Sequence, residues 1–488
     1  MDPHYMSARQ LLQGLRTGKW SSVELLARCL ELVERFNDVV NAVVILDAER
    51  ARSRARKADR ARAQGKHAGP LHGLPMTVKE TFEMDGLPTT AGVASQGSYV
   101  SSRTAVAVQR LQDAGAVVFG KTNTALLAGD LQTYNSLYGV TSNPWDTERT
   151  AGGSSGGSAA ALAVGMTPLE LGSDIGGSIR IPAHFCGVCG HKPSHGIVPV
   201  RGHVPGPPGS LTRPDLAVVG PMARTIDDLA VALDVLAGAD EPEAAGWTLR
   251  LPAARKGGRV GGYRIAAWLD DPACPVDAAT ADLLEGLVGR LLGTGLAVDT
   301  AARPEGINLA ESHELFYRLL IGAMSPGVSR SRFRTLKEQA EITQADASDY
   351  SVRLARSVIQ SHADWLRLHE RRLQLGRLWA RFFEKFDVLL CPVTSMPAFS
   401  HDWSEPVETR VVSTGQRTQA YLDLLIWPGL PGVAYLPATV VPVGRTPAGL
   451  PVGVQVVGPY LGDHTTLTFA REVERLCGGF VAPPGYGA

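Results

Sequence analysis

A glycine-rich segment in the first half of the chain has the composition of a site that attacks a carbonyl group. It reads Gly172-Ser-Asp-Ile-Gly-Gly-Ser178 and follows an apolar run at 169–171 that predicts a strand. Two adjacent glycines allow a tight turn that points successive backbone N–H groups into one cavity, as an oxyanion hole requires. Ser178 stands where an attacking hydroxyl group would lie. Because a serine hydroxyl is a weak nucleophile at neutral pH, this interpretation requires a base nearby.

The base is not obvious from the neighbouring residues. His184, His191 and His195 lie in a glycine-rich stretch that offers them no clear carboxylate partner. Lys79, one of nine lysines, ends the apolar run 74–78, which predicts a buried strand. A lysine in that position either extends its ammonium group to the surface or is buried for chemistry, where loss of water lowers its pKa.

A second block of glycines and serines reads Gly152-Gly-Ser-Ser-Gly-Gly-Ser158. It leads directly into an alanine-rich segment that predicts a helix over 159–164, which a flexible linker would not do. The block also fits the G-x-S-x-G nucleophile elbow of α/β-hydrolases, with Ser155 as the nucleophile. That alternative needs a downstream acid and histidine, and the sequence singles out no particular histidine.

Two further patterns imitate binding motifs. Residues 115–122 satisfy the P-loop expression G-x-x-x-x-G-K-[ST], but their central Ala-Val-Val-Phe favours a buried strand and no strand precedes Gly115. Residues 184–191 contain two histidines and two cysteines, the ligand types of a zinc site or a redox pair, but no second ligand pair follows at a suitable spacing. The sequence therefore predicts no nucleotide, metal or other cofactor.

Apolar runs that predict strands alternate with patterns that predict helices. Strands are expected at 76–79, 116–119, 169–171, 388–391, 438–443 and 452–457. Helices are expected from 21 to about 36 and at 104–112, 159–164, 276–292 and 350–386, the last too long to be uninterrupted. This alternation predicts an α/β fold with a largely parallel or mixed sheet covered by helices on both faces. Because the late strands resemble the early ones, a single sheet fed by both ends of the chain is at least as well supported as separate domains.

The composition excludes several classes of protein. The 488 residues contain 48 basic and 48 acidic side chains, a neutral balance that argues against bulk binding to nucleic acid or acidic membranes. Basic residues gather at 50–66, where alternating arginine and alanine favours a solvated helix face. No secretory signal or membrane-spanning stretch is visible, and six cysteines do not make a disulfide scaffold. We expect a cytoplasmic protein with no nucleic-acid or membrane partner.

Blocks spread over nearly the whole chain resemble the amidase signature family, whose hallmark is a Ser–cis-Ser–Lys triad. The blocks lie at 69–79, 120–123, 143–146, 152–161, 172–182, 190–194, 220–224 and 449–455. The glycine–serine block and the Gly-Gly-Ser-Ile-Arg block, at the family's spacing, are very specific together. The resemblance implies a single twisted α/β domain over 1–488. Its parts would be N-terminal helices over 1–66, a catalytic core over about 67–237, a helical insertion over about 276–386 and a sheet completed by 387–477.

The resemblance also assigns roles to residues. Ser178 would be the nucleophile, Ser154 the bridging serine after a cis peptide bond, and Lys79 the base. Neutral Lys79 would take a proton from Ser178 through Ser154 and later return it to the leaving amine, and water would then hydrolyse the acyl-enzyme. The implied oxyanion donors are the backbone N–H groups of Ile175, Gly176, Gly177 and Ser178. The implied supporting residues are Ser155, Asp174 and Arg180.

Departures from the family's pattern concern the substrate. Leu126 stands where many members have an acid, Glu80 stands where aspartate is usual, and larger residues replace small polar ones over 127–135. These positions lie near the substrate in the family, which implies substrate-binding roles for Asp130, Gln132 and Tyr134. Aryl acylamidase-like and urethanase-like members show similar changes, so we expect a pocket for apolar or aromatic groups.

The expected function is hydrolysis of a small amide, with anilides, carbamates and aryl esters as further substrates. Family members often dimerise, and a homodimer is compatible with the resemblance. The alternative is the A subunit of a glutamyl-tRNA amidotransferase, which works inside a complex and releases ammonia from glutamine, although the altered 126–134 region argues against a glutamine pocket. A non-catalytic scaffold or P-loop binding protein is a third possibility.

Overall fold

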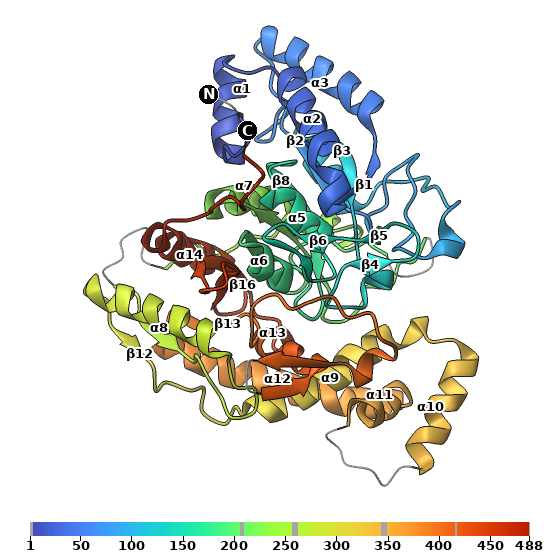
Figure 1. Ribbon diagram of the computed structural model, residues 1–488, viewed down its shortest axis with the longest axis vertical. Helices are drawn as coiled ribbons and strands as arrows, with labels where there is room; N and C mark the ends of the chain where they lie inside the picture. The colour runs from blue at the N-terminus through green and yellow to red at the C-terminus, as the bar shows by residue number, and fades with distance from the viewer. Residues whose placement is uncertain (1–2, 205–208, 256–261, 343–348, 415–416, 488) are drawn as a thin grey trace.

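A mixed sheet of eleven strands forms the centre of the computed structural model, which describes residues 3–204, 209–255, 262–342, 349–414 and 417–487 (Figure 1). The strands are β1 (Val43–Leu46), β2 (Pro75–Lys79), β3 (Val117–Thr122), β8 (Leu169–Asp174), β9 (Cys189–Lys192), β10 (Val218–Ala223), β11 (Ile265–Ala267), β12 (Val298–Asp299), β13 (Val388–Pro392), β16 (Ala438–Arg445) and β17 (Pro451–Val457). Their spatial order is β1-β3-β2-β8-β10-β9-β16-β17-β13-β11-β12. Strands from both ends of the chain therefore form one sheet, as predicted.

Fourteen α-helices surround this sheet in the described part of the chain. They are α1 (Ala8–Thr17), α2 (Ser22–Val40), α3 (Ala48–Ala63), α4 (Val106–Asp113), α5 (Gly156–Ala163), α6 (Arg180–Cys186), α7 (Ile226–Leu236), α8 (Ala278–Gly293), α9 (Leu309–Met324), α10 (Arg330–Ile342), α11 (Tyr350–Val358), α12 (His362–Lys385), α13 (Ile426–Val433) and α14 (Asp463–Cys477). Among the described residues, three small two-stranded sheets lie outside the central one: β4–β5 (Tyr134–Asn135 and Gly139–Val140), β6–β7 (Ser142–Asn143 and Asp146–Thr150) and β14–β15 (Val411–Thr414 and Arg417–Ala420).

Alternate side chains of the strands enter two separate apolar layers, because successive residues of a strand face opposite sides of the sheet. In β3, Val117 and Phe119 belong to one layer and Val118 belongs to the other. The first layer contains residues of α2, α5, α6, α9, α12 and α13, and the second contains residues of α1, α4, α7, α8 and α14. Helices cover both faces of the sheet, which confirms the predicted fold class.

The long helical pattern at 350–386 forms two helices. It is interrupted after Val358, and α12 begins after Ser361, whose hydroxyl accepts a hydrogen bond from the Asp364 N–H while the Asp364 carboxylate accepts one from the Ser361 N–H. Such a reciprocal cap marks a helix start strongly. Helices α8 to α12 lie between β11 and β13 in the chain, where the helical insertion was expected. The division of the chain into these parts, and its status as one domain, stay predictions.

The P-loop-like segment is a strand, as its apolar residues suggested. All six residues of β3 are buried, and Gly120 and Lys121 lie opposite Leu46 and Ile45 of β1. A side chain at Gly120 would place its Cβ 2.6 Å from the Ile45 carbonyl oxygen, so the glycine permits close contact between strands. The backbone of residues 117–122 is paired in the sheet and does not form a phosphate-binding loop.

The first and last described segments of the chain lie side by side. Tyr5 donates a hydrogen bond from its hydroxyl group to the Tyr486 carbonyl oxygen at 2.9 Å, and Figure 1 shows both ends of the chain close to α1. Within the described residues, no helix combines the length and the apolar character needed to cross a membrane.

Candidate active site

Two neighbouring parallel strands bring Lys79 and the segment that leads to Ser178 to one edge of the sheet. Strands β2 and β8 pair in parallel, with Thr77 opposite Glu170 and Val78 opposite Leu171. Parallel strands end on the same side of a sheet, and ligands of α/β proteins bind at that side. Lys79, the last residue of β2, therefore lies near the turn that follows Asp174 at the end of β8.

The Lys79 amine is buried and contacts two serine hydroxyl groups. Lys79 is 0% exposed, and its Nζ lies 2.6 Å from Ser154 Oγ and 3.1 Å from Ser173 Oγ. Ser154 comes two residues before α5, and the Gly153–Ser154 peptide bond is cis, which confirms the geometry that the resemblance implied. Lys79 therefore does not extend to the surface.

Asp174 organises the turn that carries Ser178. Its Oδ1 accepts hydrogen bonds from Gly177 N at 2.8 Å and Arg180 Nη2 at 2.9 Å, and its Oδ2 accepts one from Ile179 N at 3.1 Å. Gly177 has a φ angle of +115°, which residues with a Cβ rarely adopt. The carboxylate and the glycine together fold residues 174–180 into a tight turn. Burial alone would raise the pKa of Asp174, but Arg180, together with Lys192 and the Gly177 N–H group, lowers it to about 2.

The same turn lies against the segment that contains Ser154 and Ser155. Ser155 N donates a hydrogen bond to the Ser178 carbonyl oxygen at 3.2 Å, so the residue that follows Ser154 contacts the proposed nucleophile residue directly. Ser155 Oγ donates to the Ser173 carbonyl oxygen at 3.3 Å. The structure therefore brings Lys79, Ser154 and Ser178 into one buried cluster, although they are far apart in the sequence.

The hydrogen bonds narrow the set of oxyanion donors. The Gly177 N–H group is already bonded to Asp174, so it is not free to bind a substrate oxygen, contrary to what the resemblance implied. Among the described residues, the N–H groups of Ile175, Gly176 and Ser178 have no hydrogen-bond acceptor. These three remain the proposed donors, and Gly177 shapes the turn that presents them.

Burial changes the proton affinity of the groups beneath the turn. Desolvation lowers the pKa of Lys79 from 10.5 to about 7, although the negative charge of Asp174, and that of Glu170 when it is ionised, oppose the shift. Glu170 is buried in β8, and desolvation raises its pKa to about 8. Near neutral pH a substantial fraction of Lys79 is therefore uncharged and able to accept a proton.

The activity of the enzyme is expected to follow the titration of Lys79. A base must be unprotonated to act, so kcat/KM should rise with pH through an apparent pKa near 7 and level off above about pH 8. The measurement is kcat/KM for one uncharged substrate between pH 5.5 and 9.5. A constant kcat/KM over that range, or a rise only near the ordinary lysine pKa of 10.5, would contradict the role of Lys79.

The three predicted substrate-binding residues, Asp130, Gln132 and Tyr134, form hydrogen bonds with other groups of the protein. Asp130 accepts hydrogen bonds from Arg410 Nη1 at 2.7 Å and from the Tyr421 hydroxyl group. Tyr134 accepts one from Arg410 Nη2 at 2.7 Å, and Gln132 Nε2 donates to the Asp402 carbonyl oxygen at 2.6 Å. In this arrangement they form a network close to Ser154, and their direct contact with substrate stays a proposal.

Sequence reasoning did not find Ser173, Arg410 or Tyr421 as members of the site. Ser173 belongs to the Gly-Ser-Asp block, so its closeness to Lys79 could have been inferred from the parallel pairing of β2 and β8. Arg410 and Tyr421 lie about 280 residues from Asp130 in the chain, and no local pattern points to them.

Apolar side chains lie beside the turn that carries Ser178. A Cβ built on Gly176 would lie 3.2 Å from Leu425, 3.7 Å from Leu320 and 3.9 Å from Phe316. These residues come from α9 and from the segment that leads into α13. The protein next to the turn is therefore apolar.

The histidines and cysteines of the zinc-like segment have structural partners. The two ring nitrogens of His184 contact the carbonyl oxygens of Gly453 and Met396, and His191 lies between Thr439 and Asp463. Cys186 and Cys189 are buried and free. Within the described ranges, no group of three or more His, Cys, Asp or Glu side chains is arranged to hold a metal ion.

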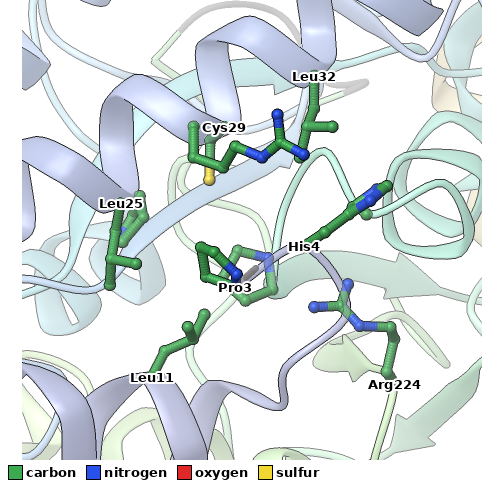
Figure 2. Close-up of a pocket in the computed structure, with 11 residues that line it drawn as sticks. Pro3, His4, Leu11, Leu25, Cys29, Leu32 and Arg224 are labelled. Carbon is green, nitrogen blue, oxygen red and sulfur yellow. The ribbon is translucent and has the colours of Figure 1, made fainter. Parts of the chain in front are cut away.

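A cavity elsewhere in the molecule does not involve these residues. Figure 2 shows it between the N-terminal segment and helices α1 and α2, with Pro3, His4, Cys29 and Arg224 among the side chains that line it. None of the lining residues belongs to the cluster around Lys79. The cavity is therefore separate from the candidate active site.

Comparisons with known proteins agree with this geometry. The family model described as Amidase matches residues 24–467. The chain belongs to the amidase family. This amidase is 33% identical over 491 residues to the A subunit of the glutamyl-tRNA(Gln) amidotransferase of Chloroflexus aurantiacus, and the match covers 97% of each chain. The match to the family makes the chain a hydrolase of C–N bonds and confirms the predicted resemblance.

Solved structures share the amidase fold. A chain from a vestigial protein complex, described as revealing the evolutionary origins of an s-triazine catabolic enzyme, is 27% identical with a TM-score of 0.82, and the match covers 98% of this amidase and 100% of that chain. A bacterial aryl acylamidase is 24% identical with a TM-score of 0.80 over 97% of this amidase and 96% of that chain, which shows the fold alone.

Because the curated relative is named for glutamyl-tRNA(Gln), the comparisons do not support the expected absence of a nucleic-acid partner.

Proposed function

We propose that this amidase cleaves the C–N bond of a small amide through an acyl-enzyme on Ser178, with Lys79 and Ser154 as the proton relay. The observation that carries the proposal is the 2.6 Å distance between the buried Lys79 Nζ and Ser154 Oγ. A buried lysine with a pKa of about 7 can accept a proton near neutral pH, and a bridging hydroxyl group can pass one between two side chains.

The reaction follows from these positions. Ser178 gives its proton through Ser154 to Lys79, and its oxygen forms a bond to the substrate carbonyl carbon. The backbone N–H groups of Ile175, Gly176 and Ser178 stabilise the negative oxygen that develops. The Lys79 ammonium then returns the proton through Ser154 to the amine nitrogen as the C–N bond breaks. Water repeats the sequence on the acyl-enzyme and releases the acid.

For the amide donor, the comparisons favour glutamine. The curated relative from Chloroflexus aurantiacus is named as the A subunit of a glutamyl-tRNA(Gln) amidotransferase, and the match spans 97% of both chains. Of the two functions expected from the sequence, the A subunit of a glutamyl-tRNA amidotransferase is therefore better supported than a hydrolase of other small amides. In this proposal the chain releases ammonia from glutamine inside a complex that acts on charged tRNA.

A second candidate is a free-standing hydrolase of anilides, carbamates or aryl esters. Two observations favour it. The turn at 174–180 lies beside the apolar side chains of Leu320, Leu425 and Phe316. Asp130 forms an ion pair with Arg410. Neither charge of that pair is available for the ammonium and carboxylate groups of glutamine.

A substrate panel separates the two candidates. The purified chain is assayed with glutamine, an acetanilide, an aryl carbamate and a nitrophenyl ester, with Ser178→Ala as the blank. Turnover of the anilide or carbamate without turnover of glutamine supports the free-standing hydrolase. Turnover of glutamine and of no other substrate supports the amidotransferase function. Labelling of Ser178 by a fluorophosphonate without turnover of any substrate also supports it. Absence of both turnover and labelling would contradict the proposed mechanism.

A further inference from the structure

A buried arginine near the candidate site has no role in the proposed relay. The Arg410 side chain is 0% exposed. Its guanidinium group donates to Asp130 Oδ2 and to the Tyr134 hydroxyl group, both at 2.7 Å, and to the Ser404 carbonyl oxygen at 2.6 Å. The planar fork of an arginine can hold several acceptors in a fixed geometry. Arg410 therefore ties residues 402–410 to residues 130–134.

Two further contacts reinforce this tie. The Tyr421 hydroxyl group donates to Asp130 Oδ1, the carboxylate oxygen that Arg410 does not use. The Gln132 side-chain amide and the Asp402 backbone exchange two hydrogen bonds, at 2.6 Å and 3.0 Å. Residues 130–134 are thus held by hydrogen bonds from three separate positions, Asp402, Arg410 and Tyr421.

The inner side of residues 130–134 lies directly against Ser154. A Cβ on Gly153 would lie 2.5 Å from the Asp130 carbonyl oxygen and 2.6 Å from Gln132 N, so these backbones are in close contact. Thr133 Oγ1 donates to the Gly152 carbonyl oxygen at 2.8 Å and accepts from Gly156 N at 2.9 Å. Thr133 therefore holds the chain on both sides of Ser154.

We propose that Arg410 is a positioning residue for the proton relay. By holding Asp130, it fixes the segment that places Ser154 within hydrogen-bonding distance of Lys79. The inference rests on the proposed roles of Lys79, Ser154 and Ser178. Because a small displacement of a reacting group slows a reaction strongly, loosening Asp130 lowers the rate of proton transfer without removing any group that touches the substrate.

Three variants test this inference. Arg410→Lys keeps the positive charge but loses the fork, and Tyr421→Phe removes only the hydroxyl group that binds Asp130. Arg149→Met is the matched control, because Arg149 also joins a carboxylate, Asp146 at 2.9 Å, to a distant carbonyl group, Ala398 at 2.8 Å. Among the described residues, no hydrogen bond joins the Arg149 side chain to residues 130–134. Thermal unfolding of each variant is measured alongside its activity.

The readout compares an amide with a nitrophenyl ester of the same acyl group. An amine leaves only when it receives a proton through Ser154, whereas nitrophenolate leaves without one. For the amide, we expect Arg410→Lys and Tyr421→Phe each to lower kcat by about tenfold with KM unchanged. For the ester we expect a smaller loss, because the ester uses the relay to activate Ser178 and water but not to protonate its leaving group. Arg149→Met should stay within about twofold of the parent for both substrates.

Each other outcome has a distinct meaning. Equal losses of kcat for amide and ester, a change confined to KM, or full amide activity in both variants would overturn the positioning role. If Arg410→Lys unfolds, Tyr421→Phe alone decides. A parent enzyme that hydrolyses neither substrate and is not labelled at Ser178 would refute the proposed function rather than this inference.

Discussion

Replacing Ser178 by alanine is expected to abolish amide hydrolysis, with kcat lower by about four orders of magnitude or more. Ser178 supplies the oxygen of the proposed acyl-enzyme, and the turn from Asp174 to Arg180 carries no other hydroxyl group. The residue is 5% exposed and loses only one oxygen atom, so the fold should persist. The measurement is kcat for the best amide of the panel, with thermal unfolding as the test of folding.

Ser155→Ala is the matched comparison for this experiment. Ser155 is the nucleophile of the alternative elbow interpretation, and its hydroxyl group donates to the Ser173 carbonyl oxygen. A fluorophosphonate should modify Ser178 in the parent and in Ser155→Ala, and should fail to modify Ser178→Ala. Peptide mapping that places the label on Ser155 would exclude Ser178 as the nucleophile.

Lys79→Met is expected to lower kcat/KM by about three orders of magnitude or more, because it removes the base and the ammonium that protonates the leaving amine. Methionine keeps an apolar stem of similar length in this buried position. Any remaining activity should lose its dependence on an apparent pKa near 7. The measurement is kcat/KM as a function of pH, and near-normal turnover would rule out Lys79 as the base.

Lys192→Met is the control for this pH dependence. Lys192 is also buried, and burial lowers its pKa to about 7, but its amine donates to the Pro193 carbonyl oxygen rather than to Ser154. The rise of activity near pH 7 should persist in Lys192→Met, whatever its kcat. Loss of that rise in Lys192→Met alone would show that the titration had been assigned to the wrong lysine.

Much of the sheet could be predicted from apolar runs, and the exceptions have a physical reason. Strands β2, β3, β13, β16 and β17 lie within three residues of the expected positions. Strand β9 was missed because Cys-Gly-His-Lys lacks an apolar pattern, and β10 because Gly-Pro, which is unfavourable in a central strand, interrupts Val-Val-Gly-Pro-Met-Ala. Their partners β8 and β16 supply the hydrogen bonds that keep these residues extended in the middle of the sheet. The short strands β1, β11 and β12 were missed as well.

The candidate site was predictable where its residues lie in local motifs. Lys79, Ser154 and Ser178 each stand in a short block of specific sequence, and the structure brings these blocks together. The bond between Gly177 N–H and Asp174 could not be inferred from the sequence, because it depends on the path of the turn. The partners of Asp130 could not be inferred either, since Arg410 and Tyr421 come from a distant segment that only the folded sheet places beside it.

The order of strands in the sheet has a consequence for synthesis of the chain. Strand β9 pairs with β16, which follows roughly 250 residues later. At about 5–20 residues per second, the ribosome needs on the order of 10–50 s to make that stretch. Once β10 has been made, β9 is an unpaired edge of the early strands until β16 follows, and free edges invite pairing with other chains. We therefore expect the nascent amidase to be open to misassociation at β9 after its proposed catalytic residues have been made and before residues 438–445 emerge.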